Sequence, residues 1–214
     1  MIEHVYRRAA ATPGVDAVIV ATDDDRIRSA IEGFGGIARM TRATHRSGTD
    51  RVAEVAAELE CDIVVNVQGD LPLIEPDMIG QAIRPLDEDP SLEMSTLRRR
   101  IIHAHERRSP HVVKVIVDRT GDALYFSRAP IPYRQSDGPF YKHIGLYVYR
   151  RTFLLTLASL PQTPLEVAES LEQLRAIEHG FRIRTVETQY ESIEVDTPED
   201  LERVRRQVAV GTSA

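Results

Sequence analysis

The chain has 214 residues, of which 27 are Lys or Arg and 33 are Asp or Glu, and its formal charge is -6. This charge gives no general attraction to nucleic acid or anionic lipid. No apolar run approaches the roughly 20 residues that cross a bilayer, so membrane insertion is not expected. The length favours one folded α/β domain over 1–209 with a short tail at 210–214. Charged residues near the start exclude a secretory signal, so we expect the cytoplasm.

The first third of the chain alternates helical and extended patterns. Apolar spacing and turn residues predict a helix over 1–11, a strand over 17–22, a helix over 27–34 and a strand over 37–41. A polar segment at 41–51 leads into another helix. The apolar run at 62–67 is typical of a central parallel strand covered on both faces, and it ends at Asp70.

The pattern changes after Met94. Extended runs over 112–117, 123–127 and 143–149 predict a mixed or antiparallel β-rich section at about 112–150. Helical periodicity returns over 165–179, and a short strand is predicted near 193–195. Thr197, Pro198 and Asp200 then form a capping pattern that opens a helix through about residue 207.

Two carboxylates are candidates for a metal site. Asp70 follows a buried strand and Asp196 precedes a capped helix, so both could lie at the carboxyl edge of one sheet, where open α/β folds bind ligands. Mg²⁺ is usually held by one or two carboxylates together with substrate phosphates. The alternative is that Asp196 only supports the helix start and Asp70 only accepts hydrogen bonds in a turn.

Two other polar groups could bind a ligand. One lies just before a helix and offers guanidinium, hydroxyl and backbone donors for a phosphate or a base edge: Arg42, His45, Ser47, Gly48, Thr49 and Arg51. In the other, Arg128 ends an extended run, and His143, Tyr147 and Tyr149 share one face of a second run, where they could recognise a polyhydroxy acid. The alternatives are an ordinary surface loop and an aromatic face packed against a helix. Glu166, Glu169, Glu172 and Gln173 have the spacing of a solvated helix face.

Together these motifs resemble the CMP-Kdo synthetase family, where Kdo is 3-deoxy-manno-octulosonate. Thr41-Arg42, His45 and the run 47–51, followed by 65–70, carry the resemblance. It continues in order through 110–118, 123–129, 143–147, 164–166, 171–175 and 195–201.

The resemblance implies a Rossmann-like nucleotide-diphospho-sugar transferase sheet with a β-rich section for dimerisation and sugar binding. In this family the anomeric hydroxyl of Kdo attacks the α-phosphate of CTP, which releases pyrophosphate and makes the activated sugar for lipopolysaccharide. Mg²⁺ would be the cofactor and a homodimer the assembly. The alternatives are a cytidylyltransferase for another acidic sugar and a noncatalytic remnant or binding module.

The resemblance also implies roles for individual residues. Asp70 and Asp196 would hold magnesium and, with Arg128, form the catalytic set. The nucleotide would be bound by Arg42, Ser47, Gly48 and Gln68. The sugar acid would be bound by Arg128, His143, Tyr147, Glu169 and Gln173, with Arg128 facing its carboxylate.

The front of the chain departs from the family pattern. The family begins with a strand and an Ile-Pro-Ala-Arg type of loop whose cations grip the triphosphate, and Met1-Ile2 matches the family beyond that loop. Leu71 and Thr44 also stand where the family usually has glutamate and aspartate. We therefore expect little or no turnover by the printed chain, and an uncovered edge in the central part of its sheet.

Overall fold

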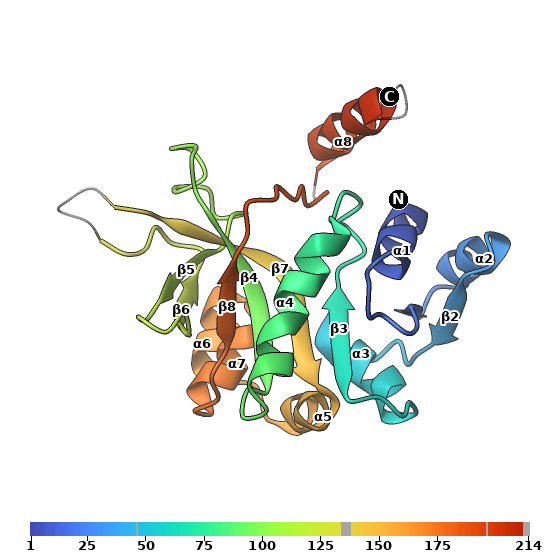
Figure 1. The fold of residues 1–214 in the computed structure, drawn as a ribbon, viewed down its shortest axis with the longest axis horizontal. Helices are drawn as coiled ribbons and strands as arrows, with labels where there is room; N and C mark the ends of the chain where they lie inside the picture. Colours follow the sequence, from blue (N-terminus) through green and yellow to red (C-terminus); the bar gives the residue numbers. More distant parts are fainter. Residues whose placement is uncertain (46, 134–137, 196, 212–214) are drawn as a thin grey trace.

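The computed structural model describes residues 1–45, 47–133, 138–195 and 197–211. Within them, helices cover both faces of a central β-sheet (Figure 1). The helices are α1 (Ile2–Ala10), α2 (Asp25–Gly33), α3 (Gly48–Ala57), α4 (Pro76–Glu88), α5 (Arg151–Ser159), α6 (Pro164–Glu169), α7 (Gln173–Glu178) and α8 (Pro198–Gly211). The strands are β1 (Ile19–Thr22), β2 (Ile37–Met40), β3 (Ile63–Val67), β4 (Met94–Arg100), β5 (Lys114–Val117), β6 (Ala123–Ser127), β7 (Tyr141–Arg150) and β8 (Arg184–Glu187).

The larger sheet is built around β7. One edge of β7 pairs antiparallel with β4, and its other edge pairs antiparallel with β5 near its start and with β3 near its end. β6 extends the sheet beyond β5 in an antiparallel hairpin, and β8 pairs parallel with β4. The mixed α/β class and the antiparallel β-rich section are therefore confirmed.

β3 is not the central parallel strand that its apolar sequence predicted. It pairs antiparallel with β7 and, within the described ranges, with no other strand, while β1 and β2 form a separate parallel pair. The prediction of burial on both faces was sound, because Val64 packs on one hydrophobic cluster and Val65 on the other. An apolar run of this kind indicates burial on both faces but does not indicate whether the strand is parallel or antiparallel. Among the described residues, β1 pairs only with β2, so β1 and β3 each have one edge without a strand partner.

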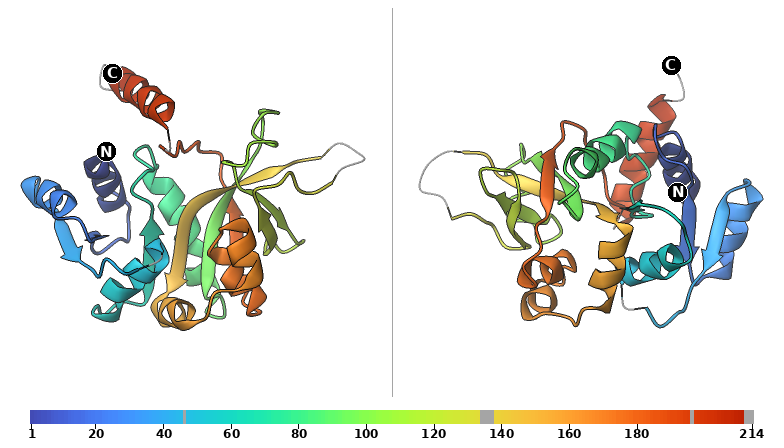
Figure 2. Two further views of the ribbon diagram at one scale, coloured as in Figure 1. Left: turned by 180° about the vertical axis from the view of Figure 1, so that it is seen from behind. Right: turned by 60° about the horizontal axis from the view of Figure 1, so that its bottom comes forward.

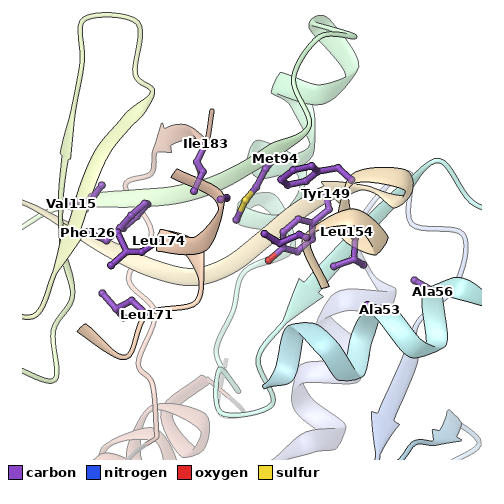
Figure 3. Packing of buried hydrophobic residues seen from close by; sticks show 13 residues of the cluster. Ala53, Ala56, Met94, Val115, Phe126, Tyr149, Leu154, Leu171, Leu174 and Ile183 are labelled. Carbon is purple, nitrogen blue, oxygen red and sulfur yellow. The ribbon is translucent and has the colours of Figure 1, made fainter. Parts of the chain in front are cut away.

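Alternate side chains of β7 divide the core into two layers. Tyr149 packs with Ala53 of α3 and Leu154 of α5 on one face, as the close view in Figure 3 shows. Leu146 and Val148 point to the opposite face, where α4 contributes a second cluster. Helices therefore cover both faces of β7. The residues of β7 that line the site described below lie between positions 142 and 147.

The helix predicted over 165–179 is two helices. α6 ends because Ser170 adopts the left-handed conformation, with φ of 54°, which a continuous helix cannot accommodate. Glu166 was expected on a solvated face, yet it is 3% exposed and accepts a 2.8 Å hydrogen bond from Nε of Arg175. Helical periodicity alone could not show that Arg175 of the next helix is buried against Glu166.

The final segment partly follows the prediction. No strand forms at residues 193–195, whereas β8 at 184–187 was missed. The predicted capping box is confirmed, since the N–H of Thr197 donates to Asp200 and the N–H of Asp200 donates to Thr197. α8 lies at the periphery of the fold in the left view of Figure 2, and its Val204 is buried. Among the described helices, none has the length and apolar character to span a bilayer.

Candidate functional site

A cavity of about 440 Å³ opens where several parts of the chain meet. The first part, the α3–β3 wall, consists of Gly48, Thr49, Gln68 and Asp70. The second, the β6–β7 wall, consists of Arg128, His143, Gly145 and Tyr147. The α6–α7 turn, the segment 191–194, the loop before β5 and α8 also contribute to the lining. Seven of the residues predicted for the site line this cavity: Gly48, Gln68, Asp70, Arg128, His143, Tyr147 and Gln173.

The start of α3 lies against Gln68. The Ser47 hydroxyl caps the helix by accepting a 3.1 Å hydrogen bond from the N–H of Asp50. A Cβ on Gly48 would lie 3.7 Å from the side-chain oxygen of Gln68, so these two residues are neighbours across the wall. The N-terminus of a helix carries unpaired N–H groups and partial positive charge. The α3–β3 wall therefore suits an anionic group.

Arg42 and Ser47 do not line the cavity. The Arg42 side chain is 72% exposed and its Nε lies 3.1 Å from a carboxylate oxygen of Glu54, which also contacts Nε2 of His45. The hydrogen bond from His45, helped by Arg42, lowers the pKa of Glu54 to about 2. Glu54 therefore ties the polar segment to α3 beside the cavity.

Asp70 lies at the rim where β3 ends. Its carbonyl accepts a 3.0 Å hydrogen bond from the N–H of Val195, which brings the segment preceding α8 alongside. Asp196, the predicted partner of Asp70, lies outside the described residues. Within the part of the chain that is described, no group of three or more His, Cys, Asp or Glu side chains could hold a metal ion.

The charge of the lining bears on whether a magnesium ion fits. Six carboxylates line the cavity but only three Lys or Arg side chains do, and two of those three are already ion-paired, Lys142 with Glu106 and Arg203 with Glu191. A polyphosphate would meet net repulsion here unless a cation accompanied it. One or two carboxylates with phosphate oxygens form an ordinary Mg²⁺ environment, so the donors fit that ion.

Arg128 is held from several directions. Its N–H donates to the Glu169 carboxylate at 2.8 Å, and its Nε donates to the Glu169 carbonyl at 3.0 Å. Its Nη1 donates to the carbonyl of Pro110 at 3.0 Å, and its own carbonyl accepts from Nζ of Lys114. Nη2 is the guanidinium nitrogen without a protein acceptor among the described residues. The cavity therefore receives a cation whose orientation is already set.

Glu169 lies behind Arg128 and does not line the cavity. One carboxylate oxygen accepts from the Ser127 hydroxyl at 2.6 Å and from the Tyr125 hydroxyl at 3.3 Å. Burial by itself would raise the pKa of Glu169, but hydrogen bonds from Ser127, the Arg128 N–H and Tyr125 outweigh it and lower that pKa. The structure thus places this predicted sugar contact where it supports Arg128.

His143 and Tyr147 present uncharged groups. The Thr96 hydroxyl donates to the carbonyl of Leu146 at 2.6 Å, so Nε2 of His143 is the donor in its 2.9 Å contact with that hydroxyl. Burial lowers the pKa of His143 to about 3 and raises the pKa of Tyr147 well above its usual value. The two rings lie 5.2 Å apart, which confirms that they share one face.

Gln173 adds a buried amide to the same cavity. It is 4% exposed, and its Nε2 has no hydrogen-bond acceptor among the described residues. An unsatisfied buried donor is costly in a folded protein unless a ligand or water accepts from it. Gln173 is therefore suited to a ligand oxygen.

Several lining residues were not predicted from the sequence. They are charged or polar groups from distant segments: Glu106, His111, Lys142, Glu172, Glu191, Glu194 and Arg203. The pair formed by Lys142 and Glu106 joins residues 36 positions apart, so no local spacing could have indicated it. The chain has only two lysines, Lys114 and Lys142, and this scarcity was the one feature of the sequence that set Lys142 apart.

Comparison with known proteins gives a consistent result. A family model described as cytidylyltransferase matches residues 1–188. The 3-deoxy-manno-octulosonate cytidylyltransferase of Pelobacter propionicus is 57% identical over 96% of this chain and 86% of its own length. The protein of the same name from Geobacter metallireducens is 58% identical over 95% of this chain and 85% of its own length.

A solved structure agrees with these sequence relatives. CMP:2-keto-3-deoxy-manno-octonic acid synthetase complexed with CTP superposes with a TM-score of 0.93 at 46% identity. The match covers 98% of this chain and 88% of that one. By contrast, HddC from Yersinia pseudotuberculosis shares only the fold, with 11% identity and a TM-score of 0.65 over 96% of this chain and 84% of that one. The family predicted from the motifs is confirmed, and this chain belongs to the 3-deoxy-manno-octulosonate cytidylyltransferases, the CMP-Kdo synthetase family.

Proposed function

We propose that this chain transfers CMP from CTP to Kdo, giving CMP-Kdo and pyrophosphate for lipopolysaccharide biosynthesis. The observation that carries the proposal is the single cavity in which Gln68 and Asp70 meet Arg128, His143 and Gln173. The 3-deoxy-manno-octulosonate cytidylyltransferase of Pelobacter propionicus is 57% identical over 96% of this chain, which supports the same assignment.

The geometry supports direct transfer without a covalent enzyme intermediate. Kdo would lie on the β6–β7 wall with its carboxylate at Arg128, and Gln173 would donate to one of its oxygens. CTP would lie along the α3–β3 wall. The anomeric hydroxyl of Kdo would then lose its proton to solvent as its oxygen attacks the α-phosphate, and pyrophosphate would leave with the bonding electron pair. Alignment of the two substrates would supply much of the rate.

Magnesium is part of this proposal. Asp70 would hold the ion, together with Asp196 as the sequence predicts, and the ion when bound would supply positive charge against the phosphates. The surplus of carboxylates in the cavity supports the need for such a charge.

Pyrophosphate release from CTP, Kdo and MgCl₂ tests the function, with omission of Kdo and addition of a chelator as controls. We expect release that requires both Kdo and the metal, and calorimetry should show that CTP and Kdo both bind. Absence of binding by both substrates, or faster turnover with another acidic sugar such as N-acetylneuraminate, would overturn the proposal.

We also propose a homodimer that works in the cytoplasm. Large apolar side chains are exposed in and near the β-rich section, with Tyr133 at 89%, Leu124 at 55% and Ile102 at 64%. Such exposure is typical of an interaction surface. Light scattering should give twice the mass of one chain. The double substitution Leu124→Ser and Tyr133→Ser should lower that mass. An unchanged dimer mass would place the interface elsewhere.

A further inference from the structure

Lys114 is a buried cation that the proposed chemistry does not use. It opens β5, is 0% exposed and does not line the cavity. Its Nζ donates to the carbonyls of Ser109 at 2.9 Å and Val112 at 2.6 Å, and to the carbonyl of Arg128. An ammonium group has three N–H donors, so the three acceptors satisfy it completely.

This arrangement is costly and therefore calls for a reason. Moving an ammonium group out of water disfavours its charged form, and burial accordingly lowers the pKa of Lys114. No carboxylate lies within 4.0 Å of its Nζ in the described part of the chain. An apolar side chain would fill the same space without the desolvation cost. What an apolar residue could not do is join three carbonyl groups.

The three carbonyls belong to two segments that both border the cavity. Ser109 and Val112 lie in the loop before β5, from which residues 111–113 reach the lining, and Arg128 follows β6. The Arg128 guanidinium donates to Pro110 in the same loop. The loop and Arg128 are thus joined twice, once by the Lys114 ammonium and once by Arg128 itself.

We infer that Lys114 is a positioning residue for the sugar acid: it ties the 109–112 loop to the backbone of Arg128 and so sets where the Arg128 guanidinium stands in the cavity. The inference rests on the proposed function. Glu169 holds the N–H of Arg128 and Lys114 holds its carbonyl, so the Arg128 backbone is fixed on both sides. Without the ammonium, three carbonyls lose their donor and the loop moves relative to Arg128.

Lys114→Met tests this inference, because it keeps the length of the side chain but removes its charge and donors. We expect the dissociation constant for Kdo, measured by calorimetry, to rise about tenfold to a hundredfold, the range for a displaced positioning group. The dissociation constant for CTP, which lies on the other wall, should change by less than about twofold. A loss of fold would affect both ligands alike.

Arg150→Met is the matched control. Arg150 lies at the far end of β7, outside the cavity lining, and its guanidinium donates to the carbonyls of Leu92 at 3.0 Å and Leu86 at 2.6 Å. Its loss should lower the melting temperature while leaving Kdo affinity within about twofold of the unmodified chain. Equal effects of Lys114→Met and Arg150→Met on Kdo binding would overturn the inference.

Lys114→Arg covers the case in which Lys114→Met does not fold. It retains charge and donors, so Kdo affinity should lie between that of the unmodified chain and that of Lys114→Met, with CTP affinity unchanged. If only Lys114→Arg folds, equal losses of Kdo and CTP affinity, or no loss of Kdo affinity, would overturn the inference. If the unmodified chain binds neither substrate, the proposed function itself has failed, which distinguishes the two failures.

Discussion

On the β6–β7 wall, the main chain and guanidinium of Arg128 make hydrogen bonds with Glu169, Pro110 and Lys114. On the α3–β3 wall, the side chain of Gln68 makes one long hydrogen bond among the described residues, 3.4 Å to Asn66. The first wall has its donors in place before any ligand arrives. The second wall offers the N-terminus of α3 and the carboxylate of Asp70. The phosphates and the metal ion that these groups would contact arrive only with the bound nucleotide. The difference teaches that one cavity can combine a preformed side with a side completed by its ligands.

The largest effect is expected at Asp70. Asp70→Asn keeps the shape of the side chain but removes the charge that would hold magnesium, so pyrophosphate release should fall by about a thousandfold, the scale of lost electrostatic stabilisation. Asp118→Asn, at a carboxylate that caps the β5–β6 turn, should leave the rate unchanged. Activity of Asp70→Asn within about tenfold of the unmodified chain would remove Asp70 from the catalytic set.

Arg128→Lys tests whether the preformed wall recognises the sugar acid. Lysine keeps the charge, but its compact ammonium group cannot reproduce the planar, forked donor geometry by which the Arg128 guanidinium contacts Glu169 and Pro110. Kdo affinity should fall about tenfold to a hundredfold, since a hydrogen bond to a charged group contributes about 1.5–3 kcal/mol. Calorimetry with CTP provides the contrast, because CTP affinity should persist. A parallel loss of CTP affinity would show that the two walls are not independent.

Protonation of His143, on the β6–β7 wall, makes the stability of the folded chain depend on pH. Its pKa is about 3 in the folded chain and about 6.5 when unfolded, so the unfolded state binds the proton first. Stability from this residue is complete above pH 6.5 and is lost as the pH falls toward 3. Urea unfolding at pH 7 and pH 5 should show a smaller decrease for His143→Gln than for the unmodified chain. Equal decreases would mean that His143 titrates normally.

The smallest effect is expected at Glu54, which supports the α3–β3 side from outside the cavity. Glu54→Gln weakens its contacts with Arg42 and His45, but because Arg42 is mostly exposed, water screens much of the interaction. CTP affinity should fall by only about threefold, and less at high salt. Glu3→Gln, which breaks the exposed pair with Arg7 on α1, is the matched control and should have no effect.

Local patterns predicted some elements well and others poorly. The extended runs that form β5 and β6 and the capping box of Thr197 and Asp200 were predicted because their signals lie within a few residues of one another. The break at Ser170 and the antiparallel direction of β3 were missed. A left-handed serine has no reliable local signal, and a strand covered on both faces has the same composition in either direction.

The sequence by itself determined the family, the extended runs of the β-rich section and seven of the residues that line the cavity, because ordered motifs and strand alternation are local properties of the chain. Only the tertiary structure decided which side chains face the cavity and which support it. Glu169 was predicted as a sugar contact, yet its carboxylate is taken up by Ser127, Tyr125 and Arg128. Such a role depends on contacts between residues about 40 positions apart, which spacing along the chain cannot record.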